Sequence, residues 1–167
     1  AAAMDRLTPK YLQVADRPGF TADVLGSYRA RISQGVEVVP GAVACVRALA
    51  ASMPVALVSG SSREEIEIIL HGLGILGCFQ FFLGAEDYPK SKPAPDGYQK
   101  AFRQLGVQGG ESVIFEDSAA GIESAHAAGA FVVAVTGAAM PGQDLSKAHR
   151  AVPDLTGIDA EWVRKLV

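Results

Sequence analysis

The sequence lacks long hydrophobic runs and contains little cysteine. None of its apolar runs approaches the roughly 18 residues that a membrane-spanning helix needs, so nothing in it predicts such a helix. The stretch Ala1–Met4 has neither the basic nor the apolar region of a signal peptide. Cys45 and Cys78 do not have the spacing of a metal or redox site, so we expect buried thiols in a reducing, cytoplasmic location.

An excess of charge of one sign is also lacking. The 167 residues include 15 basic and 18 acidic side chains, and the net charge of −3 gives no electrostatic reason to expect nucleic acid or an anionic membrane as a partner. A hydrophobic content of 49% with 20% charged residues is typical of a globular domain with a sizeable core. The three histidines are scattered, and we assign none of them to catalysis.

Short apolar runs alternate with stretches of helical periodicity. Strands are expected at five places, namely 55–58, 79–83, 113–115, 131–135 and within 149–155. Helices are expected between them, and one more within residues 21–32. This alternation predicts an α/β fold with a parallel, Rossmann-like sheet between two layers of helices. Residues 1–35 would form a separate helical piece, and the main domain would begin at residue 36.

Two adjacent acids follow one of these strands. Glu116 and Asp117 come directly after the apolar run 113–115, and the small residues of 118–121 read as a helix start. In a parallel sheet, ligands bind at the carboxyl ends of the strands. Two neighbouring carboxylates are costly unless a cation neutralises them, and oxygen ligands suit Mg²⁺. The alternative is a solvated acidic turn, and this pair alone does not decide between the two.

A second strand ends in small polar residues. Ser59, Gly60 and Ser61 follow the run 55–58, and Ser62 with Glu65 forms a capping box that starts a helix. Hydroxyls and backbone N–H groups at such a junction can hold a phosphate. The alternative is that the serines only make the turn and cap the helix.

A lysine lies between these two segments in the sequence. Lys92 precedes Pro93, and Pro95 suits the first turn of the next helix. A lysine held in this way supplies a point charge for a phosphate or for the acidic pair. Most surface lysines have no such role, so a functional role for Lys92 is supported only together with the other two segments.

The three motifs together resemble the haloacid dehalogenase superfamily. They are Val-Ser-Gly-Ser-Ser at 58–62, Ser-Lys-Pro-Ala-Pro-Asp at 91–96 and Phe-Glu-Asp-Ser-Ala-Ala-Gly-Ile at 115–122. Their order and separation are similar to those of the phosphoglycolate phosphatase and β-phosphoglucomutase branch, over roughly Val36 to Val135. The resemblance implies the superfamily's α/β core and, for residues 1–35, the remnant of a helical cap.

The resemblance also implies roles for individual residues. Ser59 matches the phosphate-binding serine or threonine, and Gly60 and Ser61 match neighbours that add contacts to the phosphate. Lys92 matches the lysine that neutralises the phosphoryl group and the nucleophile. Ser59 and Lys92 would therefore be both phosphate-binding and catalytic.

The resemblance also implies that the acidic pair binds the metal ion. Glu116 and Asp117 match the acids that hold Mg²⁺, and Asp117 is expected to be the direct ligand and to be needed for catalysis. This assignment agrees with the physical logic of phosphoryl transfer, which depends on positioning and on charge neutralisation.

The superfamily's nucleophile motif is absent. It is an Asp-x-Asp at the end of the first, central core strand, and this sequence contains no Asp-x-Asp. The neighbours of that strand would be 55–58 and 113–115. We therefore expect 36–167 to be a core without its first strand, and the sequence to lack its natural N-terminus.

The expected function is that of a Mg²⁺-dependent phosphatase. In the complete protein, the resemblance implies an aspartate that attacks a small phosphomonoester, such as phosphoglycolate or a sugar phosphate, and a second aspartate that protonates the leaving oxygen. This chain alone is expected to be inactive, with a missing N-terminal segment supplying the nucleophile. Two alternatives stay open: a phosphosugar mutase, and a non-catalytic domain that binds phosphate or Mg²⁺.

Overall fold

The computed structural model describes residues 37–167. The chain divides after Val36 into two units, and the second, Glu37–Val167, contains all the described residues. The helix expected within 21–32 and the cap expected for 1–35 lie outside the described residues and stay predictions.

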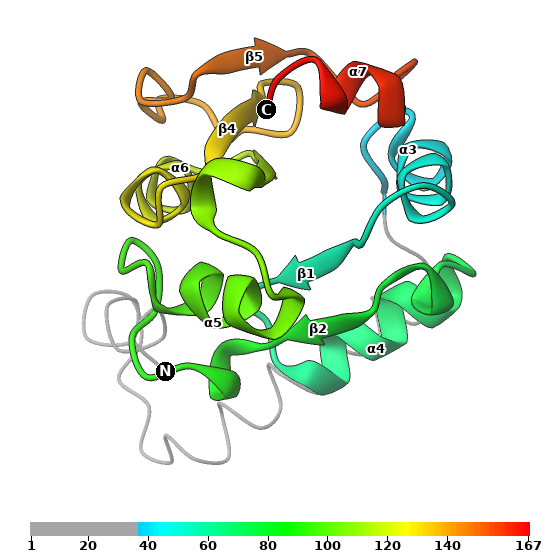
Figure 1. Cartoon of the computed structure of the whole chain (residues 1–167), viewed down its shortest axis with the longest axis horizontal. Helices are drawn as coiled ribbons and strands as arrows, with labels where there is room; N and C mark the ends of the chain where they lie inside the picture. The colour runs from blue at the N-terminus through cyan, green and yellow to red at the C-terminus, as the bar shows by residue number, and fades with distance from the viewer. Residues whose placement is uncertain (1–36) are drawn as a thin grey trace, which may run out of the picture. The chain divides into compact units, whose positions relative to one another are not determined.

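Within residues 37–167, five parallel strands form two separate sheets (Figure 1). The first sheet pairs β1 (Ala56–Val58) with β2 (Phe81–Leu83). The second has the order β3-β4-β5, and its strands are Val113–Glu116, Phe131–Val135 and Arg150–Val152. All five strands lie where the sequence predicts them, and the expected α/β class is confirmed. The single sheet that the pattern suggests is divided among the described residues, because β1 and β3 do not pair.

Helices cover both faces of these sheets (Figure 1). They are α3 (Ala42–Ala50), α4 (Arg63–Gly72), α5 (Asp96–Leu105), α6 (Ala119–Ala127) and α7 (Ala160–Arg164). Helices α5 and α6 share a core with one face of the strands, whereas α3, α4 and α7 pack on the other face. The described part of the chain also has three short 3₁₀ turns between the main elements, Leu76–Cys78, Ala85–Asp87 and Gly109–Glu111.

Local capping sets the start of two helices near strand ends. The Ser62 side chain accepts a hydrogen bond from the Glu65 N–H, and the Glu65 carboxylate accepts one from the Ser62 N–H, so the predicted capping box is confirmed. Ser118 caps α6 by accepting from the Gly121 N–H. These caps satisfy N–H groups that a helix start otherwise leaves unpaired.

The core on the α5–α6 side is the most completely buried part of the described chain. Ile122 and Ala125 of α6 pack against Val132 and Ala134 of β4, and all four are fully buried. Close approach of α5 to β1 depends on Gly97, where a Cβ would lie 2.8 Å from a methyl group of Val58. This packing brings the first turn of α5 next to the carboxyl end of β1.

Helix α3 packs against both sheets. Cys45 and Leu49 belong to the cluster that includes Val113 and Phe115 of β3. On the same helix, Val43 and Val46 pack with the cluster that includes Leu57 of β1. A single helix therefore spans the interval between β1 and β3 on this face.

The described chain contains no helix long and apolar enough to cross a membrane. Cys45 and Cys78 are unpaired thiols, Cys45 buried and Cys78 half-buried. Burial, with the charge of Asp159 as a smaller contribution, raises the pKa of the Cys45 thiol, as expected for a thiol that packs in a core.

Truncation of the α6 core should destabilise the fold. We expect Ile122→Ala to lower the free energy of unfolding by about 3 kcal/mol, because a fully buried side chain leaves a cavity in a closed core. Urea denaturation measures the loss. Met140→Ala is the control, since Met140 is 72% exposed and its truncation should change the stability by less than about 0.5 kcal/mol. A loss as small as that of the control would contradict this packing.

Candidate active site

Lys92 joins the carboxyl ends of β1 and β3. Its Nζ donates to the Val58 carbonyl at 3.2 Å, and it forms an ion pair with the Glu116 carboxylate. The same ammonium donates to the Tyr98 hydroxyl at 2.9 Å. Because these contacts come from two sheets and from α5, Lys92 lies at the centre of this edge of the fold.

Glu116 is a buried carboxylate whose two oxygens both accept hydrogen bonds. Oε1 accepts from Lys92 and from the Tyr98 hydroxyl at 2.6 Å, and Oε2 accepts from the Ser118 hydroxyl at 3.1 Å. Burial raises the pKa of Glu116, but the Lys92 charge and the hydrogen bonds from Lys92, Tyr98 and Ser118 together bring it below the ordinary glutamate value. The carboxylate is therefore ionised at neutral pH.

The start of α6 is built around this carboxylate. The backbone N–H groups of Asp117 and Ser118 also donate to Glu116 Oε2, at 3.2 and 3.4 Å. A Cβ on Gly121 would collide with the Glu116 carboxyl group. The glycine in the first turn of α6 thus leaves the space that the carboxylate fills, at the helix end that favours negative charge.

Asp117 lies next to the pair in a more open position. It is an exposed residue, and no described side chain donates a hydrogen bond to its carboxylate. Partial burial and the charge of Glu116 raise the pKa of Asp117 above the ordinary aspartate value. Its oxygens are therefore the ones available to a ligand at this strand end.

The loop after β1 lies at the same edge of the fold. Ser59 follows the carbonyl that Lys92 contacts, its own carbonyl accepts from the Tyr88 hydroxyl at 2.7 Å, and its Oγ accepts from the Ser61 N–H at 3.1 Å. Gly60 is exposed, with open space where a Cβ would be. The structure thus gathers the six predicted residues at the carboxyl ends of β1 and β3, and their roles in phosphate and metal binding stay predictions.

Tyr98 belongs to this network and was not singled out from the sequence. It lies on the buried face of α5 and is 6% exposed. Its hydroxyl donates to Glu116 and accepts from Lys92. Burial, followed by the charge of Glu116, raises the pKa of Tyr98 far above its ordinary value. A buried tyrosine needs a partner for its hydroxyl, and this is the signal in the sequence that points to it.

The acidic pair offers a limited donor set for a metal ion. Within residues 37–167, no group of three or more His, Cys, Asp or Glu side chains could hold one. Both oxygens of Glu116 are engaged, so Asp117 is the carboxylate that fits. Mg²⁺ is commonly held by one or two carboxylates with several waters, so a single available carboxylate at Asp117 fits this ion.

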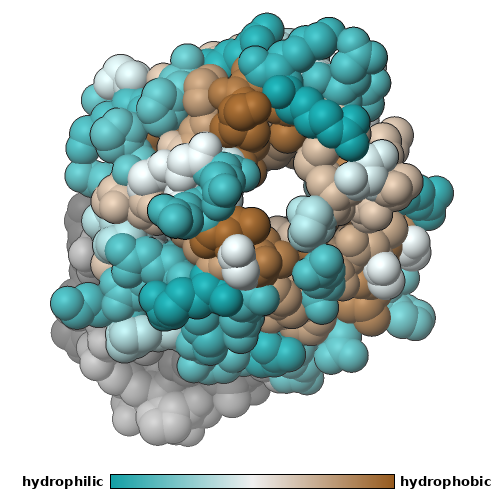
Figure 2. Space-filling view, viewed as in Figure 1, coloured by the Kyte–Doolittle hydropathy of each residue, from teal (hydrophilic) through white to brown (hydrophobic). Residues whose placement is uncertain are grey.

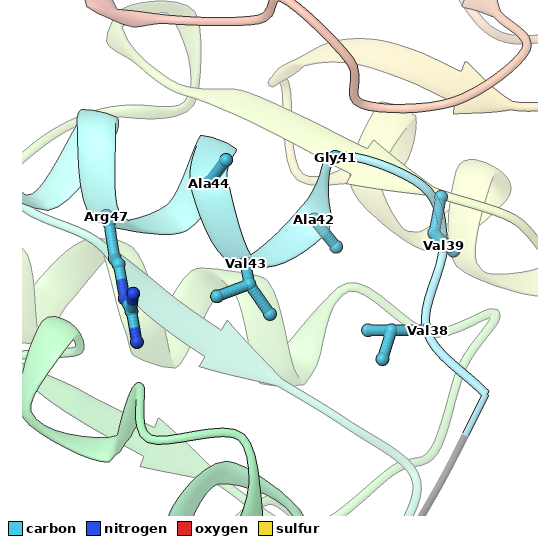
Figure 3. A pocket seen from close by; sticks show the side chains of 7 residues that line it. All are labelled: Val38, Val39, Gly41, Ala42, Val43, Ala44 and Arg47. Atoms are coloured by element: carbon cyan, nitrogen blue, oxygen red, sulfur yellow. The ribbon is translucent and has the colours of Figure 1, made fainter.

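A separate hollow lies beside the start of α3. It has a volume of about 410 Å³ and is lined by Val38, Val39, Gly41, Ala42, Val43, Ala44 and Arg47. Figure 3 shows Val38 and Val43 pointing into the same space. None of the predicted site residues lines it, so the hollow is separate from the Lys92 network.

Comparison with known families identifies the family of this chain. A model described as haloacid dehalogenase-like hydrolase matches residues 3–135. The chain belongs to this family. The resemblance inferred from the three sequence motifs is therefore confirmed.

The relatives share part of their length with this chain. A validoxylamine A 7'-phosphate phosphatase from Streptomyces hygroscopicus subsp. limoneus is 33% identical over 64% of this chain and 49% of its own length. A fructose-1-phosphate phosphatase from Escherichia coli is 34% identical over 60% of this chain and 53% of its own length. The chain thus spans about half of these two relatives.

Solved structures share the fold. The crystal structure of a β-phosphoglucomutase from Clostridium difficile aligns with a TM-score of 0.78 and 22% identity. The alignment covers 98% of this chain and 74% of that protein. At this identity, the likeness supports the fold alone.

Removal of the Tyr98 hydroxyl should change the titration of Glu116. In Tyr98→Phe, we expect the pKa of Glu116 to rise towards the ordinary glutamate value, because one of its donors is lost. The free energy of unfolding at neutral pH should fall by about 1–2 kcal/mol. Carbon-13 NMR of the side-chain carboxyls measures the first effect, and urea denaturation measures the second.

Tyr88→Phe is the matched control. The Tyr88 hydroxyl donates to the Ser59 carbonyl and not to Glu116, so its loss should cost a similar stability without moving the Glu116 titration. If both variants left the pKa of Glu116 in place, Tyr98 would have no part in the network.

Proposed function

We propose that this chain is the core of a Mg²⁺-dependent phosphatase that hydrolyses a small phosphomonoester, of the phosphoglycolate or sugar-phosphate kind, through an aspartyl-phosphate. The observation that carries this proposal is the Lys92–Glu116 pair at the strand ends, next to the Ser59 loop and the open carboxylate of Asp117. Membership of a hydrolase family and the similarity to the two phosphatases described above support it.

The proposed chemistry needs an aspartate from outside these 167 residues, which contain no Asp-x-Asp. Its carboxylate would attack phosphorus and form a new P–O bond while the bond to the leaving oxygen breaks and that oxygen takes a proton from a second aspartate. Water would then hydrolyse the acyl phosphate. We expect the chain alone to show no turnover.

The chain's own residues would bind and orient the phosphate. Ser59 and the N–H groups around Gly60 and Ser61 would donate to its oxygens, and Lys92 would neutralise their charge. The lysine is already held in place by Glu116 and Tyr98, so little reordering is needed when the phosphate binds. Asp117 would hold Mg²⁺, with Glu116 close behind it, and the bound ion would neutralise further charge on the phosphate.

The relatives support the proposed substrate class. The names of the two phosphatases describe phosphate esters of small polyhydroxylated molecules. A phosphosugar mutase is less well supported, because the likeness to β-phosphoglucomutase rests on 22% identity and concerns the fold. The cytoplasmic location stays a prediction, in keeping with the two unpaired cysteines.

The experiment that tests this function adds the nucleophilic aspartate to the chain. An amino-terminal extension that encodes an apolar strand ending in Asp-x-Asp is fused ahead of residue 1, and phosphate release is measured from a panel of sugar phosphates and phosphoglycolate. We expect Mg²⁺-dependent release by the extended chain and none by the 167-residue chain. Ser59→Ala and Asp117→Asn in the extended chain should each lower kcat by about 100-fold or more.

Ser146→Ala is the control variant. Ser146 is exposed in the segment that follows β4, its contact is with Asp144, and its truncation should leave kcat unchanged. Circular dichroism shows whether each variant is folded. A folded extended chain that releases no phosphate from any ester, or one whose activity survives Asp117→Asn, would contradict the proposal.

A further inference from the structure

The backbone carbonyls of the loop after β1 are bonded to a neighbouring turn. The Ser59 carbonyl accepts from the Tyr88 hydroxyl at 2.7 Å, and the Ser61 carbonyl accepts from the Ala85 N–H at 2.9 Å. Both donors lie in the residues that follow β2, Gly84–Tyr88, which we call the support turn. The two carbonyls are therefore directed towards the support turn.

Three donors of the same loop are open among the described residues. The Gly60 N–H has no acceptor in this part of the chain, and the hydroxyl groups of Ser59 and Ser61 donate to none of its residues. A loop with engaged carbonyls and open donors suits an anion, because N–H and O–H groups attract a phosphate whereas a carbonyl oxygen beside it would repel it.

Asp87 holds the support turn together. Its Oδ2 accepts from the buried Gly84 N–H at 2.8 Å and from the Arg63 guanidinium at 3.0 Å. Lys100 Nζ lies 3.9 Å from its Oδ1. Burial raises the pKa of Asp87, but the hydrogen bonds from Gly84 and Arg63 and the charges of Arg63 and Lys100 bring it below the ordinary aspartate value. One carboxylate thus closes the turn and ties it to α4 and α5.

The support turn lies in close contact with the start of α4. The Arg63 N–H, at the first residue of this helix, donates to the Glu86 carboxylate at 2.9 Å. A Cβ on Gly84 would lie 2.7 Å from the Arg63 nitrogen and 3.0 Å from the Ser61 carbonyl oxygen. Because the contact is this close, a change in the turn would move the loop after β1.

The surroundings of the support turn are polar. Figure 2 shows hydrophilic residues gathered over the area where Figure 1 has α5 and the chain that follows β2. Glu86 is exposed and Asp87 is half-buried. The turn therefore keeps its conformation through the polar contacts described above more than through apolar packing.

We propose that Asp87 is a positioning residue of the phosphate site. It does not touch the phosphate. It keeps the support turn in the conformation that engages the carbonyls of Ser59 and Ser61, so that the loop presents donors to the phosphate. This role rests on the proposed function, since it concerns the phosphate that the loop would bind. An aspartate that acted by charge alone would repel phosphate, and its removal would strengthen binding. The positioning role predicts the reverse.

The test uses the 167-residue chain and inorganic phosphate, whose binding needs no nucleophile. The backbone amide NMR signals of Gly60 and Ser61 are followed as phosphate is added, and we expect a saturable shift. Asp87→Ala should bind phosphate about tenfold more weakly. Asp87→Asn should recover most of the affinity, because its amide oxygen can still accept from the Gly84 N–H and the exposed Arg63 pair contributes little.

Tyr88→Phe tests the same role from the side of the loop. It removes the donor to the Ser59 carbonyl and leaves Asp87 in place, so phosphate binding should weaken by about three- to tenfold. Circular dichroism shows whether each variant is folded, and Tyr88→Phe decides the question if Asp87→Ala does not fold.

Asp154→Ala is the matched control. Asp154 accepts from the Thr156 N–H in the loop after β5, so its truncation removes the same charge and the same kind of contact at another loop and should leave the phosphate affinity unchanged. A folded Asp87→Ala chain, or a Tyr88→Phe chain, that binds phosphate as tightly as the parent or more tightly would overturn this role alone. A parent chain whose Gly60 and Ser61 signals do not respond to phosphate would contradict the proposed function as well.

Discussion

The buried ion pair between Lys92 and Glu116 is the interaction on which the described structure depends. It joins two sheets that share no paired strands among the described residues, and it fixes the start of α6 and the turn before α5 at the same place. A buried charge pair is tolerated only when its remaining hydrogen-bonding capacity is used. Tyr98, Ser118 and the Val58 carbonyl meet that need.

The same pair links the fold to the proposed chemistry. A phosphate site needs a cation that is held in position before the substrate arrives, and Glu116 holds Lys92 at the carboxyl ends of two strands. Glu116 is thereby occupied, and Asp117 remains the open carboxylate beside it. Two adjacent acids thus have different surroundings: one orients the lysine, and the other is free for a ligand.

Features set by short-range rules could be predicted from the sequence. The capping box of Ser62 and Glu65, the strands and the family motifs follow from neighbouring residues and from spacing. Two features could not be read this way. The contact of Tyr98 with Glu116 joins residues 18 positions apart on different elements. The division into two sheets does not follow from periodicity, and only the family resemblance, which places an absent strand between 55–58 and 113–115, gave a reason to expect it. Periodicity predicts that a strand exists, but it does not say what lies beside it.

The most direct test of the central claim is the pH dependence of stability in Lys92→Ala. Without the ammonium, the buried Glu116 carboxylate is uncompensated, so unfolding at pH 7 should need about 3 kcal/mol less than in the parent chain. In the parent fold the pKa of Glu116 is lowered, so the stability that its carboxylate contributes is lost as the pH falls through this lowered pKa. In Lys92→Ala, protonation of Glu116 at low pH instead removes the uncompensated buried charge. The difference should therefore shrink below about pH 5. A small loss that is the same at every pH, as for the exposed Lys147–Glu123 pair, would contradict the account.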